Sequence, residues 1–411
     1  MISTYKIQLK IVLKIIKISF SLFLIYIYIY APPFKIIPFG LDKIIMLYAI
    51  IYITFQKKWS NLIFIFKKEF FLLLLLLLFS FFRSLASEDY TYLMNDFLLF
   101  SEVIVCSYFL YLLINSKYQL KLDIILIICS LIASVISLYL ILNPSVAFHL
   151  KTDVLKFPEH LIDRFQFRGY GLSDGLLFSY PVVLGFISGF IIMGLRSNKI
   201  MIIFLPLLLI AIFANARSGL VPVLVSIILS LLFNFRHFVK NTGVLILVLV
   251  LFGGAITYYI NNNEMLQASL EWGFSSFDIL GSFLKGEDAE NLDVLFTDMQ
   301  VFPKDIIGWI FGTGKFIFTN NIETTDIGYL LRLNFGGILY SFILLILITY
   351  MFIRLFKVNK YIAYLLFISL IYLHFKSDFF IVNTGSRFFF FVYCICILNP
   401  SYFKSVKLKY Q

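Results

Sequence analysis

The chain has 411 residues, of which 61% are hydrophobic and 14% are charged, and its mean hydropathy is +0.94. This composition excludes a soluble globular protein, whose surface needs a much larger share of charged residues. The net charge of +11 does not indicate a nucleic-acid partner, because the lysines lie in short loops between apolar segments, as determinants of membrane topology do. The four cysteines fall inside apolar segments, so the sequence predicts neither a disulfide framework nor a metal site.

Long apolar segments recur along the whole chain. Several approach the roughly 17–25 residues that a membrane-spanning helix needs. Because a bilayer offers no hydrogen bonds to the backbone, these segments must be helices rather than open sheet. We therefore predict an all-α, polytopic integral membrane protein that forms a single membrane domain. Twelve spans are expected, at 11–30, 39–55, 69–82, 97–114, 121–142, 175–195, 200–214, 219–235, 243–260, 331–353, 361–374 and 387–398.

Two of these segments have alternative interpretations. The first follows several lysines, as in a signal peptide, but no small-residue cleavage site follows it, so we expect an uncleaved span. The third contains seven consecutive leucines from Leu72 to Leu78, and the stretch 56–68 is either a loop or an extension of that span.

The lysines between the spans predict the orientation. If all twelve segments cross the membrane, the lysines of the short connections and of the C-terminal segment share the side of the N-terminus. These are Lys57, Lys58, Lys67, Lys68, Lys117, Lys121, Lys199, Lys240, Lys357, Lys360, Lys404, Lys407 and Lys409. Because positive loops stay in the cytoplasm, both termini are expected there.

Two connections on the outer side are longer than a hairpin needs, at 143–174 and 261–330. The second is polar at its start but contains apolar residues such as Ile306, Ile307 and Trp309. Such clusters predict short helices that lie on the membrane surface.

Arginine has the opposite distribution from lysine, because most arginines fall on the outer side, together with nearly all acidic residues. Those arginines are Arg83, Arg164, Arg168, Arg217, Arg332 and Arg387. A guanidinium binds phosphate with two parallel hydrogen bonds, whereas lysine acts as a point charge. The distribution predicts a polar site that faces the outer compartment, while the spans carry few central charges.

Arg217 is the most informative of these arginines, since it joins two apolar segments against the positive-inside rule. Ser218 is expected to cap the helix that follows, whose N-terminus faces outward. An arginine beside a helix N-terminus suits an anion, above all phosphate. The alternative is an interfacial arginine that contacts lipid headgroups.

A second candidate lies in the first outer loop. Arg164 and Arg168 are four residues apart, on one face if a helix persists there. Two adjacent cations repel each other unless an anion lies between them, and Gly169 and Gly171 allow a ligand to approach Arg168. The alternative is a surface helix in which Asp163 pairs with an arginine.

The end of the second outer loop contains a glycine-rich phrase at 312–314 and an acidic phrase at 326–329. Thr325 or Asp326 is expected to cap the helix of the tenth span, and a role of Asp326 in a site is equally open. The glycines at 336 and 337 are expected to break that helix. For His374, at the end of the eleventh span, a structural role is expected.

At this point the chain resembles bacterial O-antigen polymerases and the related O-antigen ligases. The resemblance rests on a dozen spans, inner termini, a large late outer loop, the Ala216–Gly219 phrase and the phrases at 312–314 and 326–329. Arg164 and Gly175 also fit an arginine-x10-glycine pattern associated with the polymerases. Ligases of this family use a histidine in the large loop, and this chain has none between His237 and His374, which favours a polymerase.

The resemblance implies a glycosyltransferase of the bacterial inner membrane that joins undecaprenyl-diphosphate-linked repeat units into O-antigen or capsule-type polysaccharide. The partners would be these glycans, membrane lipid and a chain-length regulator; neither a metal nor an organic cofactor is expected. The diphosphate would bind Arg217, Arg168, Arg164 and Ser218, and the glycan would bind Tyr329 and Tyr170. Asp326 and Asp174 are the candidates for the catalytic carboxylate that accepts a proton.

Other functions remain open from the sequence. A flippase for lipid-linked oligosaccharides or another transporter also commonly has twelve spans, but transporters tend to show internal repeats and charges near the bilayer midplane. An O-antigen ligase and a non-enzymatic assembly protein or sensor are further alternatives.

Overall fold

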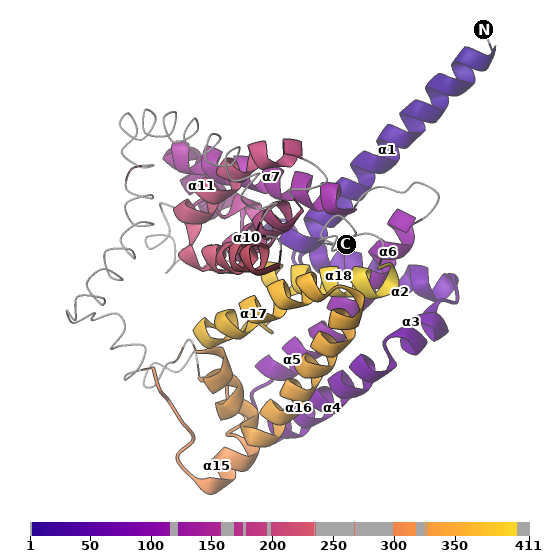
Figure 1. Cartoon of the computed structure of the whole chain (residues 1–411). Coiled ribbons are helices and arrows are strands. Elements are labelled where there is room, and N and C mark those ends of the chain that lie inside the picture. The colour runs from indigo at the N-terminus through magenta and orange to yellow at the C-terminus, as the bar shows by residue number, and fades with distance from the viewer. Residues whose placement is uncertain are drawn as a thin grey trace.

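The computed structural model describes residues 2–115, 122–157, 168–175, 178–194, 199–233, 235, 267, 299–317, 325 and 327–400. Within these ranges every regular element is helical, apart from one isolated antiparallel bridge between Phe34 and Leu155. The predicted all-helical class is therefore confirmed for the described part of the chain. The helices form a bundle from which the N-terminal end of α1 projects (Figure 1).

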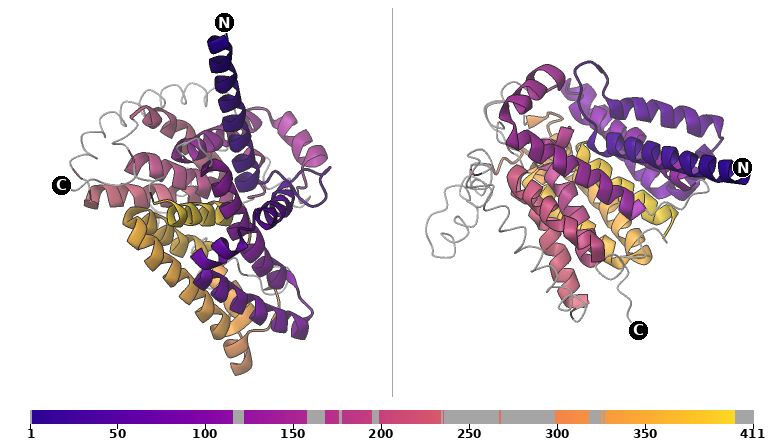
Figure 2. Two further views of the ribbon diagram at one scale, coloured as in Figure 1. Left: turned by 90° about the vertical axis from the view of Figure 1, so that its right-hand side faces the viewer. Right: turned by 90° about the horizontal axis from the view of Figure 1, so that it is seen from above.

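The first four helices form one end of the bundle (Figure 2). They are α1 (Ile2–Tyr30), α2 (Leu41–Phe55), α3 (Trp59–Ile65) and α4 (Lys67–Ser87). The ambiguous stretch 56–68 thus contains a short helix of its own. It ends at Phe66, whose φ of −108° and ψ of 28° interrupt the helix before the leucine-rich α4.

The next helices carry the chain through the centre and into the first long connection. They are α5 (Thr91–Leu98), η1 (Leu99–Ile104), α6 (Val105–Asn115), α7 (Leu122–Leu142), α8 (Pro144–His149) and η2 (Leu150–Val154). The elements α5, η1 and α6 follow one another without a break, and the middle one is a π-helix. Its wider turn places Glu102 in the interior with no exposed surface.

The third group surrounds the predicted hairpin at Arg217. It consists of η3 (Tyr170–Leu172), α10 (Ser179–Met193), η4 (Lys199–Phe204), α11 (Leu205–Asn215), η5 (Arg217–Gly219) and the apolar helix that continues to Phe233. Every residue of α10 is buried, so this helix lies inside the protein rather than against lipid.

The last group returns to the centre of the bundle. It consists of α15 (Ile306–Phe311), α16 (Gly328–Val358), α17 (Lys360–Lys376) and α18 (Thr384–Leu398). The helix α16 packs against α4, α15 and α17, as Figures 1 and 2 also show. In α18 all residues from Thr384 to Cys396 are buried, and the helix contacts α1, α6, α10 and α16.

Four of these helices are long and apolar enough to cross a membrane, which indicates a membrane protein. They are Lys67–Ser87, Thr91–Ile114, Leu122–Leu142 and Gly328–Val358. Shorter apolar helices occur at Ile18–Tyr30, Ser179–Met193, Met201–Asn215, Arg217–Phe233 and Thr384–Leu398. The predicted span 243–260 lies outside the described residues, and the count of twelve and the orientation stay predictions.

Near the ends of the predicted spans, three arginines form networks with acidic residues in the interior of the bundle. Arg332, 1% exposed, binds Asp96 and Asp378, and its Nη1 is 3.1 Å from an oxygen of Asp96. Arg354 contacts Glu69, and Tyr393 donates to the same carboxylate. A buried charge is tolerated when charged partners surround it. Asp96 lies on α5 and Glu69 on α4, whereas Asp378 lies in the connection between α17 and α18.

The third network is centred on Arg387, which has no exposed surface. Its guanidinium is 3.2 Å from Asp42 and 3.4 Å from Glu102, and it also contacts Asp174. The distribution of arginines had predicted that Arg332 and Arg387 face an outer aqueous compartment. That prediction is wrong for these two residues, because both are buried. They bind helices to one another inside the bundle.

Candidate functional site

Three cationic side chains from separate segments gather beside the N-terminus of η5. Lys151 lies on η2, Arg168 precedes η3, and Arg217 begins η5. The Nζ of Lys151 donates to the backbone oxygen of Arg168 at 2.6 Å, and the charge of Arg168 acts on both Lys151 and Arg217. We call these three residues the basic cluster. The structure thus brings together Arg217 and Arg168, which the sequence analysis had assigned to one diphosphate site.

The electrostatics of the basic cluster favour an anion. Lys151 is only 4% exposed, and burial together with the nearby charge of Arg168 lowers the pKa of Lys151 to about 8. Burial and a like charge both disfavour a protonated amine. An anion placed among the three cations would remove that penalty, and phosphate oxygens suit the guanidinium fork.

The backbone that presents Arg168 is held in an unusual conformation. Tyr170, Gly171 and Leu172 have φ angles of 50°, 55° and 60°, in the left-handed region. Such conformations cost on the order of 1–3 kcal/mol per non-glycine residue and persist only where neighbours hold them. Here the N–H of Tyr170 donates to Asn215 at 2.8 Å, and the hydroxyl of Tyr26 donates to the oxygen of Gly171 at 2.7 Å.

Asn215 connects this turn to the hairpin of Arg217. The side chain of Asn215 has no exposed surface, accepts from the N–H of Tyr170 and donates to the hydroxyl of Ser137 at 2.8 Å. Because Asn215 is two residues before Arg217, its hydrogen bonds fix the separation between Arg168 and Arg217. The side-chain amide of Asn215 therefore stabilises the backbone that presents Arg168 and Arg217.

The small residues around Arg217 have a packing reason. A Cβ on Gly219 would lie 2.4 Å from the backbone oxygen of Pro181, so only glycine permits α10 to approach η5 this closely. The predicted cap by Ser218 is wrong, since the N-cap of η5 is Ala216 and no side chain caps it. Ser218 lies inside the turn, where its buried hydroxyl has no partner among the described residues.

The two tyrosines nominated for glycan binding differ in accessibility. Tyr170 is 2% exposed and its hydroxyl accepts from Arg168 at 3.1 Å, so its ring is not open to a sugar and instead supports the basic cluster. Tyr329 is 36% exposed, packs against Phe375 and lies on α16, outside the basic cluster. Arg164 lies outside the described residues.

The two candidate carboxylates also differ. Asp174 contacts Arg387 and accepts from the hydroxyl of Thr384 at 2.7 Å. Burial raises the pKa of Asp174, whereas Arg387 and Thr384 act in the opposite direction. A raised pKa is the direction a general base near neutral pH needs. Asp326 lies outside the described residues, so its role stays a prediction.

The glycine-rich phrase at 312–314 has a structural function. Gly312 has a φ of 73°, and a Cβ there would lie 2.2 Å from the oxygen of Phe335. Arg83 donates to the oxygen of Gly312 at 2.5 Å, and Ser87 donates to that of Gly314 at 2.8 Å. These contacts attach the segment after α15 to α4 and α16. The N-cap of α16 is Ile327 rather than Thr325, whose hydroxyl accepts from the N–H of Ile327 at 3.1 Å.

Sequence reasoning missed Lys151 and Asn215. Lys151 is a lysine in a predicted outer loop, so the same positive-inside argument that singled out Arg217 could have found it. No sequence signal identifies Asn215, whose role depends on contacts with Tyr170 and Ser137. Within the described ranges, no group of three or more His, Cys, Asp or Glu side chains suits a metal ion.

No protein-family model, curated protein sequence or solved structure matches this chain. The chemistry of the basic cluster and its place among apolar helices are therefore the features that point to a function.

Proposed function

We propose that this chain is a membrane glycosyltransferase that joins lipid-diphosphate-linked oligosaccharide repeat units into a polysaccharide at the outer face of the bacterial inner membrane. The observation that carries the proposal is the convergence of Lys151, Arg168 and Arg217. A diphosphate attached to a lipid presents two negative charges at the membrane boundary, where fixed cations on membrane helices can bind it. Helices apolar enough to cross a bilayer supply the setting that a polyprenyl tail requires.

The proposed reaction exchanges one bond to the anomeric carbon for another. The bond between that carbon and the diphosphate oxygen breaks, and a hydroxyl oxygen of a second lipid-linked unit forms the new glycosidic bond. Lys151, Arg168 and Arg217 stabilise the charge that develops on the departing diphosphate. The hydroxyl proton passes to a carboxylate, for which Asp174 and Asp326 remain the candidates. The leaving group is already activated, so this chemistry requires no metal.

Substitution of Arg217 tests this function. We expect Arg217→Ala to lower polymer formation by about a hundredfold or more, because a lost charge-stabilising donor typically costs this much. The measurement is glycan chain length in cells that carry the variant as the only copy, with membrane insertion checked by immunoblot. Lys156→Ala is the matched control, since Lys156 is also cationic but donates to the oxygen of Pro38, away from the basic cluster. Long chains retained by an inserted Arg217→Ala protein would remove Arg217 from the mechanism.

A flippase for lipid-linked oligosaccharides is the second candidate. The buried network of Arg387 favours it, because ionisable residues inside a helix bundle often mark transport or proton pathways. A deletion strain separates the two functions. Single repeat units that still reach the cell surface support a polymerase, whereas loss of all surface units supports a flippase.

A further inference from the structure

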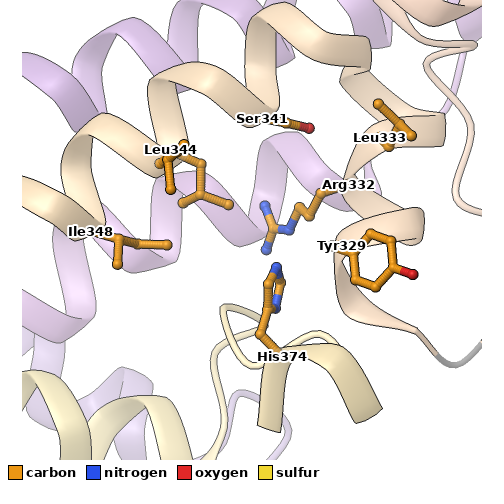
Figure 3. A pocket seen from close by; sticks show the side chains of 8 residues that line it. Tyr329, Arg332, Leu333, Ser341, Leu344, Ile348 and His374 are labelled. Atoms are coloured by element: carbon orange, nitrogen blue, oxygen red, sulfur yellow. The ribbon is translucent and has the colours of Figure 1, made fainter. Parts of the chain in front are cut away.

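A cavity lies beside α16 and α17, apart from the basic cluster. Its volume is about 270 Å³, and its walls are mostly apolar (Figure 3). The lining includes Tyr329, Arg332, Leu344, Leu345, Ile348 and His374. Leu345 is 57% exposed and Tyr329 is 36% exposed, so the cavity opens at the surface of α16. The length and composition of α16 allow it to span a bilayer, and in that setting this opening would face lipid.

The guanidinium of Arg332 forms one polar wall of the cavity. Its Nε donates to Asp378 at 2.7 Å, and its Nη1 donates to Asp96 at 3.1 Å and to Tyr340. Its Nη2 is buried and has no acceptor among the described residues. A buried donor without an acceptor costs roughly 1–3 kcal/mol, so this nitrogen is a place where a ligand oxygen would gain a strong hydrogen bond.

His374 presents a second donor at the same wall. Its Nδ1 accepts from the N–H of Phe379 at 3.4 Å, which assigns the ring proton to Nε2. No described residue accepts a hydrogen bond from that Nε2. In Figure 3 the tip of the imidazole is directed toward the guanidinium of Arg332. Two donors thus meet at one wall, and an acceptor from outside the described chain would satisfy both.

The surrounding charges favour an uncharged acceptor. Asp96 and Asp378 both accept hydrogen bonds as carboxylates do, and together they exceed the single positive charge of Arg332. A further anion would therefore be repelled at this wall, whereas a carbonyl oxygen accepts from both donors without adding charge.

The position of Arg332 along α16 suits the ester region of a lipid. α16 is broken at Gly337, and its continuous part from 338 to 358 has 21 residues, which at about 1.5 Å per residue span about 32 Å, close to the hydrocarbon thickness of about 30 Å. When this part spans the bilayer, the break at Gly337 lies near the edge of the hydrocarbon. Arg332 lies five residues before the break, near that edge, where glycerolipid ester carbonyls lie.

We propose that this cavity binds one acyl chain of a bilayer glycerolipid, whose ester carbonyl accepts hydrogen bonds from Arg332 Nη2 and His374 Nε2. The apolar residues Leu344, Leu345 and Ile348 contact the chain. This site is distinct from the basic cluster, and its occupancy does not depend on the glycosyltransferase function.

The experiment compares two lipids that differ only in the carbonyl. The full-length protein is placed in nanodiscs of diester phosphatidylethanolamine or of its dialkyl ether analogue, and native mass spectrometry measures the lipid retained after the nanodisc is removed. We expect the diester to be retained about fivefold more, the factor that one net hydrogen bond supplies. His374→Phe keeps an aromatic ring but removes one of the two donors, and it should reduce the preference for the diester.

Two neighbouring substitutions test the place of binding. Leu345→Trp fills the mouth of the cavity and should lower retention of the diester about fivefold or more. Ile346→Trp is the matched control, because Ile346 is also exposed on α16 but does not line the cavity. Equal retention of diester and ether, or equal effects of the two tryptophans, would overturn the proposal. Arg217 does not line the cavity, so Arg217→Ala should retain the diester as the wild type does. Lipid retention is measured without polymer formation, so failure of this proposal can be distinguished from failure of the proposed function.

Discussion

Lys151 shows how the surroundings of a single residue change its pKa. In the sequence it is one lysine among many, yet in the folded chain it is buried beside Arg168, and its pKa falls to about 8. Arg217 differs, because its position between two apolar segments already marks it as exceptional. Lys151 loses its charge as pH rises through about 8, whereas an arginine such as Arg217 keeps its proton there.

Binding to the basic cluster should weaken as pH rises through about 8, because Lys151 then loses its proton. The ligand to use is a prenyl diphosphate that carries a sugar. Each of its phosphates has one ester bond and the shared anhydride bond, so neither has a second proton that titrates in this range. Affinity is measured against pH for the purified protein. Lys151→Met should remove the pH dependence, whereas Lys156→Met should keep it.

The stability of the free protein should change in the opposite direction. Because the pKa of Lys151 is lower in the folded chain than the ordinary lysine value of about 10.4, the charged form destabilises the fold. This destabilisation is complete below about pH 8 and is relieved as pH rises towards 10.4. An affinity for the sugar-carrying diphosphate that rises with pH, as thermal stability should, would contradict the assignment of Lys151 to the basic cluster.

At the scale of elements, glycines set how closely segments approach. In α16, Gly337 has a φ of 65° and a ψ of −165°, a conformation that is essentially restricted to glycine. This break confirms that the glycines at 336 and 337 interrupt the helix, as the sequence predicted. It lets α15 approach, because a Cβ on Gly337 would lie 2.4 Å from the oxygen of Ile310.

Gly337→Ala should destabilise the protein by about 1–3 kcal/mol, from backbone strain and from the clash with Ile310. Thermal unfolding in detergent micelles measures the change. Gly385→Ala is a suitable comparison, because a Cβ there meets nothing closer than 3.2 Å and its backbone is ordinary. If both variants unfold at the same temperature, the close approach of α15 does not depend on Gly337.

For the whole molecule, charged networks determine how the helices assemble. Arg387 on α18 meets carboxylates from α2, η1 and the segment before α10, which are separated by more than two hundred residues from α18. In a membrane, where the hydrophobic effect does not distinguish one helix face from another, such polar contacts select specific neighbours. The same contacts explain why α18 is buried on all sides.

Arg387→Met should destabilise the fold by about 3–5 kcal/mol, because it leaves the carboxylates of Asp42, Glu102 and Asp174 together without their arginine. The second substitution Glu102→Gln removes one of those negative charges, so the double variant should recover part of the loss. Thermal unfolding of the single and double variants measures both effects. An unchanged midpoint for Arg387→Met, or no recovery in the double variant, would show that the network does not stabilise the assembly.

The sequence by itself determined the helical class and most helix positions, and it singled out Arg217 for the proposed site. Apolar length and backbone hydrogen bonding inside a bilayer are local constraints, so they can be read along the chain. The same reasoning identified Arg168 and predicted the break at Gly337 and the short helix at Ile306–Phe311. It did not identify Lys151 as a member of the basic cluster, and it wrongly assigned a capping role to Ser218.

Only the tertiary structure decided which charges meet. Arg332, Arg387 and Arg217 look alike in the sequence, because each lies near the end of an apolar segment. Their roles differ because Arg332 and Arg387 bind carboxylates from segments distant in the chain, whereas the charge of Arg168 acts on Arg217. Pairing of charges depends on distances of a few ångströms between residues far apart in the chain, and no local pattern records those distances.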